Sequence, residues 1–179
     1  EFNSWIAPFI MEAINSRIVL RSNALMGMAY GKDFTYSEGV LTGPGFKGRV
    51  GAVMSTLGFG ALGIGLFFSP LRALLEKFVL PAPGEGPSPE AQLKGFFDLR
   101  LYGADNDGNH LMVKVTGDRD PGYGSTAKML AQAGLCLAMD IKKEDQAGGF
   151  LTPSTAMGSP LVKRLEDHAG LKFQLIEKS

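Results

Sequence analysis

The segment Val50–Phe68 constrains this chain more than any other, because nineteen successive residues carry no charged side chain. Five of the nineteen are glycine, and Gly58, Gly60 and Gly63 match the G-x-G-x-x-G pattern of a dinucleotide-binding turn. Three interpretations are open: a dinucleotide-binding turn, a membrane segment of the roughly 20 apolar residues that cross a bilayer, or a glycine-rich packing helix.

The dinucleotide interpretation fits the letters of this segment but not its surroundings. A Rossmann turn joins a strand to a helix, and an acidic residue follows about 20 residues later at the end of a second strand. Glu76 stands near that offset, but it lies within Leu71–Leu80, which Ser69 and Pro70 mark as a helix. We therefore expect residues 50–80 to form an apolar helical insert without a cofactor, facing the core, a partner subunit, an acyl chain or lipid.

Composition excludes several classes of protein. Eighteen basic and 18 acidic side chains give a formal charge of zero, which argues against a nucleic-acid binder that neutralises phosphates. Cys136 is the only cysteine, so an internal disulfide and a multi-cysteine zinc site are excluded, and a reducing, cytoplasmic setting is expected. With His110 and His168 far apart in sequence, we expect no metal site. A length of 179 residues suits a single domain over residues 1–179.

Local patterns predict the first elements. Trp5–Met28 has apolar residues at helical spacing, with Pro8 in the first turn and Gly27 as the stop. Phe34–Gly39 alternates and predicts a strand. Leu41–Gly48 is rich in glycine and proline, and it predicts a loop.

Asn15, Arg21 and Asn23 are polar residues on the otherwise apolar first helix. They form either a solvated face with a cap or a row of hydrogen-bond donors that lines a cleft. Arg17 and Arg21, four residues apart, share a helix face and would hold a carboxylate or a phosphate.

Tyr36 and Glu38 lie on one face of the predicted strand. A carboxylate half-buried against aromatic rings has its pKa raised by desolvation, which suits a general acid or base. The alternative is a charged residue of an edge strand in water.

The second half of the chain predicts a sheet with helices. Phe96–Tyr102 and His110–Thr116 alternate around a turn-rich connector, which is typical of a hairpin. A helix over Thr126–Asp140, a helix that begins at Ser159-Pro160, and a last strand over Leu171–Leu175 follow. Because no parallel crossovers link these strands, we predict an α+β domain: an antiparallel or mixed sheet with helices packed mainly on one face, and no Rossmann domain.

The start of the helix at Thr126 is a candidate anion contact. Gly122, Gly124, Ser125 and Thr126 combine free backbone N–H groups with two hydroxyls. Simple capping of the helix is the alternative.

Five separated motifs, in this order, resemble the C-terminal half of the saccharopine-dehydrogenase-like oxidoreductases, including the trans-acting enoyl reductases of lipid biosynthesis. The similarity runs along nearly the whole chain. The motifs are Ala7–Met11 with Ile14–Arg17 and Arg21–Leu25, Tyr30–Gly31 with Phe34–Glu38, Pro83–Ser88, Asp120–Tyr123 with Thr126–Leu130, and Gly149–Pro153.

The resemblance implies a two-domain enzyme, in which an N-terminal Rossmann domain binds NAD(P). Its C-terminal α+β domain, similar to that of glyceraldehyde-3-phosphate-type dehydrogenases, shapes the substrate cleft and often the dimer interface. This sequence resembles the second part only, so we expect a fragment that is inactive alone, with its own Rossmann domain, a second copy and a small acidic or acyl substrate as partners. No catalytic residue is implied.

The leading hypothesis is therefore a substrate-binding and dimerisation domain in which Asn15, Arg21, Asn23, Tyr36 and Glu38 position the substrate. The alternative is a non-catalytic module that contacts a lipid or membrane surface through residues 50–68.

Overall fold

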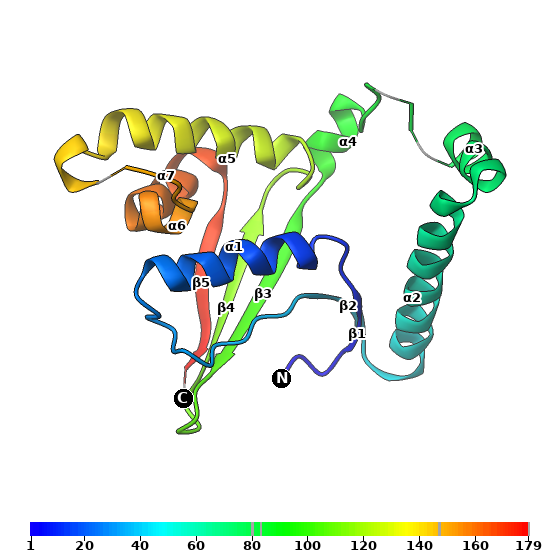
Figure 1. Ribbon diagram of the computed structural model, residues 1–179, viewed down its shortest axis with the longest axis horizontal. Coiled ribbons are helices and arrows are strands. Elements are labelled where there is room, and N and C mark those ends of the chain that lie inside the picture. Colours follow the sequence, from blue (N-terminus) through cyan, green and yellow to red (C-terminus); the bar gives the residue numbers. More distant parts are fainter. Residues whose placement is uncertain (80, 83, 147, 179) are drawn as a thin grey trace. The chain divides into compact units, whose positions relative to one another are not determined.

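The computed structural model describes residues 1–79, 81–82, 84–146 and 148–178 (Figure 1). Contacts divide the chain into two compact units, Glu1–Gly86 and Pro87–Ser179. Each unit has its own small antiparallel sheet and its own helices. The single domain predicted over residues 1–179 stays a prediction.

The first unit consists of a two-stranded sheet and three helices. Strands β1 and β2 pair antiparallel, with Ala7 opposite Val40, and the side chain of Ala7 is buried. Helix α2 packs against both strands. The elements are β1 (Trp5–Pro8), α1 (Glu12–Leu25), β2 (Gly39–Gly43), α2 (Gly45–Phe67) and α3 (Ser69–Phe78).

Two predictions for the start of the chain were wrong. The helix predicted over Trp5–Met28 begins at Glu12, because Trp5–Pro8 is instead drawn into the ladder with Gly39–Gly43. The strand predicted over Phe34–Gly39 begins only at Gly39. Alternation places side chains on two sides, but a strand also needs a partner for its backbone groups, and only residues 39–43 have one.

The loop predicted over Leu41–Gly48 was also wrong, because it is the junction of β2 and α2. Gly43 and Gly45 have φ values of +96° and +66°, which favour glycine and turn the chain sharply into the helix. A Cβ atom on Gly48 would lie 1.9 Å from the carbonyl oxygen of Gly43. The glycines therefore permit a close strand–helix contact.

The G-x-G-x-x-G pattern lies inside α2 and not at the turn between β2 and α2. Around Gly58, Gly60 and Gly63, no atom lies within 4 Å of an added Cβ, so these glycines make no close contact in the chain. The predicted apolar insert is helical through α2 and α3 to Phe78, and residue 80 lies outside the described residues.

The second unit is a three-stranded antiparallel sheet in the order β3–β4–β5. The predicted hairpin is confirmed, with Leu99 opposite Val115. The elements are α4 (Pro89–Lys94), β3 (Phe97–Ala104), β4 (His110–Gly117), α5 (Gly124–Leu135), a π-helical turn (Cys136–Asp140), a 3-10 turn (Lys143–Asp145), α6 (Pro153–Ala156), α7 (Gly158–Ala169) and β5 (Lys172–Lys178).

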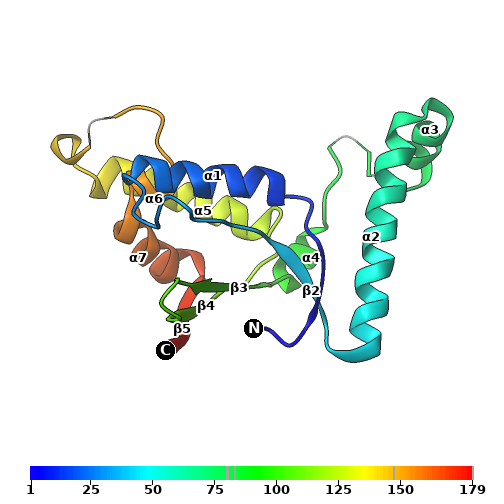
Figure 2. The ribbon, with the colours of Figure 1, turned by 60° about the horizontal axis from the view of Figure 1, so that its bottom comes forward.

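The core of this unit lies between α5, α7 and the sheet, and Figure 2 shows both helices on the same side of the strands. Leu165 and Ala169 of α7 are buried with Leu171. Partly buried side chains from the sheet and the helices pack around them: Phe97, Val115, Met129, Leu161 and Phe173. The α+β class is confirmed, and in the described ranges every strand pair is antiparallel, unlike a Rossmann domain.

Candidate functional site

Three of the five predicted substrate contacts meet in the first unit. The Glu38 carboxylate accepts a hydrogen bond at Oε2 from Asn15 Nδ2 (2.8 Å) and another at Oε1 from the Tyr36 hydroxyl (2.5 Å). All three side chains are half-buried. We call Asn15, Tyr36 and Glu38 the Glu38 cluster.

The fold builds the cluster from two segments that are distant in sequence. Asn15 lies in the first half of α1, whereas Tyr36 and Glu38 lie in the extended segment that leads into β2. Glu12 of α1 accepts a hydrogen bond from the backbone N–H of Glu38 (3.3 Å) and so ties that segment to the helix. Alternation keeps Tyr36 and Glu38 on one side although no strand forms there.

The electrostatics of the cluster keep the phenol protonated. Burial raises the pKa of Tyr36 first, and the hydrogen bond to Glu38 and the negative charge of Glu38 raise it further. A second negative charge beside a carboxylate is unfavourable. At neutral pH, Tyr36 is therefore a hydrogen-bond donor, and the cluster offers a neutral phenol, an amide and a carboxylate within one half-buried site.

Asn23 has partners within the chain. Its Oδ1 accepts a hydrogen bond from the backbone N–H of Tyr30 (2.8 Å), and its Nδ2 donates one to the carbonyl of Gly31 (3.0 Å). The side chain is only 4% exposed. Asn23 thus holds the turn that follows α1, and its contact with a substrate stays a prediction.

Arg21 is exposed on α1 and is not part of the Glu38 cluster. Arg21 comes six positions after Asn15, which places the two side chains about 120° apart around the helix axis. A substrate contact by Arg21 therefore requires a molecule that reaches around α1.

The start of α5 already holds an anion, the carboxylate of Asp120. Its oxygens accept hydrogen bonds from the backbone N–H groups of Gly122 (3.0 Å), Tyr123 (3.0 Å) and Gly124 (2.7 Å). The N–H of Gly124 in particular lowers the pKa of Asp120. The sequence prediction missed this residue, although the Asp-Pro-Gly signature of a side-chain turn was present.

The hydroxyls at this helix start are also engaged. Ser125 is fully buried and donates to the carbonyl of Arg119 (3.2 Å), and Thr126 donates to the carbonyl of Pro121 (2.6 Å). The anion contact predicted at Gly122, Gly124, Ser125 and Thr126 stays a prediction. An external anion there would have to displace Asp120.

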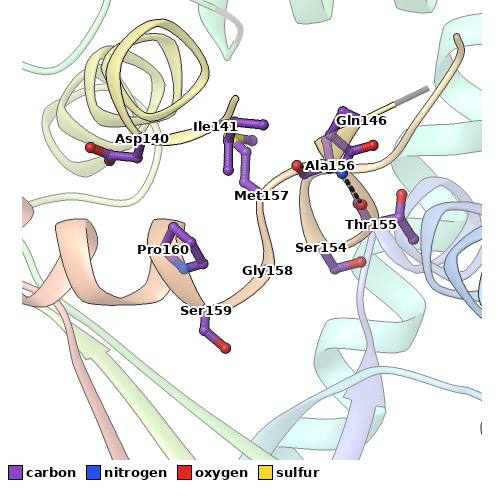
Figure 3. Close-up of a pocket in the computed structure, with 10 residues that line it drawn as sticks. All are labelled: Asp140, Ile141, Gln146, Ser154, Thr155, Ala156, Met157, Gly158, Ser159 and Pro160. Atoms are coloured by element: carbon purple, nitrogen blue, oxygen red, sulfur yellow. Dashed lines mark hydrogen bonds between the residues drawn. The ribbon is translucent and has the colours of Figure 1, made fainter. Parts of the chain in front are cut away.

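An open hollow of about 380 Å³ lies in the second unit, and sequence reasoning missed it (Figure 3). Gln146 lies in the wall of the hollow, and its Nε2 donates hydrogen bonds to the backbone carbonyls of Thr155 (3.0 Å) and Ala156 (2.9 Å). Asp140 is paired with Arg164, which lowers the pKa of Asp140 through a hydrogen bond. The residues lining the hollow are Asp140, Ile141, Gln146, Ser154, Thr155, Ala156, Met157, Gly158, Ser159 and Pro160. Gln146 and Asp140 thus have partners within the chain.

Cys136 is 0% exposed, and burial raises the pKa of its thiol. Both observations are those of a packed core thiol, since the reactive form is the thiolate. Across residues 1–79, 81–82, 84–146 and 148–178, no three His, Cys, Asp or Glu side chains gather as a metal site would require.

Sequence comparison finds relatives named for enoyl reduction. A Mycobacterium tuberculosis protein provisionally named a trans-acting enoyl reductase is 40% identical over 173 residues, which are 95% of this chain and 41% of that protein. Trans-acting enoyl reductases of Mycobacterium ulcerans and Mycobacterium leprae are 38% and 36% identical, over 90% of this chain and 39% of each relative. This chain spans about two fifths of the length of these curated relatives. No protein-family model and no solved structure matches it.

Proposed function

We propose that this chain is the substrate-binding and dimerisation domain of an NAD(P)-dependent oxidoreductase of the saccharopine-dehydrogenase-like, trans-acting enoyl reductase type. The observation that carries the proposal is the 40% identity over 173 residues to a protein named for enoyl reduction. Because the match takes up 41% of that relative, the proposed enzyme has room for a separate Rossmann domain. Its proposed setting is the cytoplasm.

The glycine motif of this chain does not fit a dinucleotide. The G-x-G-x-x-G pattern lies in the middle of α2, where the helix has satisfied the backbone N–H groups that would otherwise bind a pyrophosphate. We therefore assign NAD(P) to the part of the enzyme outside this chain. This chain contributes the groups that bind and orient the substrate.

The Glu38 cluster supplies polar contacts at the substrate. The Glu38 carboxylate would repel an anion, and the single O–H of Tyr36 is already donated to Glu38. The amide of Asn15 has a second N–H, which is compatible with a neutral acyl carbonyl. An acidic group of the substrate belongs near Arg21 instead, because Arg17 and Arg21 lie on one face of α1. Asn23 stabilises the end of α1 through its hydrogen bonds to the backbone of Tyr30 and Gly31.

Replacing Arg21 by alanine in the complete enzyme tests this assignment. We expect KM for an acidic acyl substrate to rise about tenfold, since a charge-assisted hydrogen bond contributes roughly 1.5–3 kcal/mol and an exposed one less. Arg100→Ala, on β3 of the second unit, is the matched control and should leave KM unchanged. Unaltered kinetics of Arg21→Ala would remove Arg21 from the site.

Two binding measurements test the wider proposal. The isolated chain should show no saturable binding of NADPH, whereas the complete enzyme should bind it at micromolar concentration. Sedimentation of the complete enzyme should give a dimer. Saturable NADPH binding by residues 1–179 alone would contradict the division of labour between the two domains.

A further inference from the structure

The hairpin formed by α2 and α3, Gly45–Phe78, leaves an unusual amount of apolar surface exposed. Within the ranges that the structure describes, α2 is the one helix long and apolar enough to cross a bilayer by length and composition. Only 11% of its most apolar window is buried. A core helix of this composition would be mostly buried. The apolar surface of α2 is therefore expected to be covered by something other than this chain.

The hairpin contacts the two-stranded sheet at its start and packs on itself near its other end. The first turns of α2 pack on β1 and β2, where Gly48 and Ala52 are buried. Near the other end, Gly65 lets α3 approach closely, since a Cβ atom there would lie 2.9 Å from Leu75 Cδ1. Figure 2 shows α2 continuing past β1 and β2 towards α3.

Large apolar side chains are exposed on opposite sides of α2. Leu57 is 63% exposed and Phe59 40% exposed, although two residues of a helix lie about 200° apart around its axis. Phe67, at the tip between the two helices, is 90% exposed. One protein partner covers one side of a helix, whereas lipid chains surround it. This distribution therefore favours a lipid environment over a second copy of the chain.

Basic residues flank the apolar surface at both ends. Lys47 and Arg49 precede it in the first turns of α2, and Arg72 and Lys77 follow it on α3. The one acidic residue of the hairpin, Glu76, is paired with Arg72 (3.4 Å). Each Lys or Arg beside an anionic membrane strengthens binding roughly fivefold. The charge of the hairpin is thus complementary to anionic lipid headgroups.

The same basic residues indicate whether the hairpin crosses a bilayer or stays on one side of it. Lys and Arg are enriched on the cytoplasmic side of membrane helices, so a crossing helix with basic residues at both ends goes against this bias. Helix α3 has ten residues and rises about 15 Å, which is half of a hydrocarbon core of about 30 Å and too short for a return crossing. Trp5 stacks under Arg49 at 5.6 Å, an aromatic–basic pair suited to the headgroup level.

We propose that the α2–α3 hairpin inserts into one leaflet of an anionic lipid bilayer and enters and leaves through the same face. The exposed apolar side chains from Val53 to Phe68 and the apolar side of α3 lie among the acyl chains. Lys47, Arg49 and Lys77 lie at the headgroups. This anchoring does not depend on the enzymatic activity proposed above.

Co-sedimentation of the full chain with phospholipid vesicles tests the proposal. The chain should pellet with vesicles that contain phosphatidylglycerol and much less with pure phosphatidylcholine. Raising the salt from about 0.1 M to about 0.5 M, which shortens the screening length about twofold, should weaken binding. The double variant Lys47→Gln/Lys77→Gln should bind about 25-fold more weakly, from roughly fivefold for each charge.

Apolar variants separate insertion from charge attraction alone. Leu57→Glu/Phe67→Glu places charges on exposed positions, so folding is retained, and binding should fall at least as far as in the basic variant. Leu130→Glu, on the exposed side of α5, is the matched control and should bind like the unchanged chain. Trypsin added outside the vesicles should cut the chain on both sides of the hairpin.

Three outcomes would overturn the proposal. The first is no pelleting with anionic vesicles. The second is a dimer in solution that the Leu57→Glu/Phe67→Glu variant dissociates, together with no vesicle binding, which would identify a second copy as the occupant. The third is protection of one flank from trypsin, which would show a crossing helix. Failure of the oxidoreductase proposal would change none of these measurements.

Discussion

Replacing Tyr36 by phenylalanine tests the Glu38 cluster directly. The phenol donates to a charged acceptor at 2.5 Å, and hydrogen bonds to charged groups contribute about 1.5–3 kcal/mol. The ring is retained, so no cavity adds to the loss, and water reaches the half-buried carboxylate in the variant. We therefore expect the lower end, a loss of about 1.5 kcal/mol in the free energy of unfolding.

Urea unfolding followed by tryptophan fluorescence measures this loss in the relevant unit. The chain has one tryptophan, and Trp5 lies on β1 in the same unit as the cluster. Linear extrapolation of the two unfolding curves gives the difference, and the slopes should agree. Tyr123→Phe, at an exposed tyrosine of the second unit, is the control and should change stability by less than about 0.5 kcal/mol.

The effect of pH gives the second arm of this test. Because the pKa of Tyr36 is raised in the folded chain, its contribution is fully present below the unfolded pKa of about 10. It is lost as the pH rises from there through the folded pKa. The unchanged chain should therefore lose its advantage over Tyr36→Phe above about pH 10. A difference near zero at neutral pH, or one that does not shrink in alkali, would refute the hydrogen bond.

Further substitutions at Gly48, Gly58 and Asp120 test other parts of the fold. Gly48→Ala should destabilise the first unit by about 1–3 kcal/mol in urea unfolding, because its Cβ would lie 1.9 Å from the carbonyl of Gly43; Gly58→Ala, with open space around it, should instead stabilise by up to about 1 kcal/mol. Asp120→Ala should lower the melting temperature, and Asp120→Asn should restore part of it. The pKa of Asp120 is lowered, so its contribution is present above the unfolded value of about 4 and is lost as the pH falls through the folded pKa. If acid lowered the melting temperature of Asp120→Ala as much as that of the unchanged chain, this role of Asp120 would be contradicted.

Local sequence patterns determined most of the second unit. The alternation in Phe97–Ala104 and His110–Gly117 predicted the hairpin correctly, since both strands lie close in sequence and pair through a short turn. The end of α7 also has a local cause, because Gly170 has a φ of +72°, a conformation that glycine adopts readily. Helices on one face of this sheet followed from the α+β pattern.

The first unit was harder to predict because its sheet is not local. Trp5–Pro8 pairs with Gly39–Gly43 across an intervening helix, and neither segment shows a sustained alternation. The glycines of residues 43–48 predict a loop, whereas in the structure they allow α2 to start directly against β2. Such a close contact depends on two backbones meeting, which single-residue preferences do not describe.

The candidate site divides in the same way. The sequence by itself placed Tyr36 and Glu38 on one side of the chain and marked Asn15 as a polar residue of the first helix. Only the tertiary structure showed that Asn15 donates a hydrogen bond to Glu38, 23 residues away in sequence. It also showed that the Asp120 carboxylate accepts hydrogen bonds from the free backbone N–H groups at the start of α5. The exposure of α2 was likewise visible only in the structure. Periodicity and turn preferences act over a few residues and can be read from the sequence, whereas partners and burial depend on which distant segments the folded chain brings into contact.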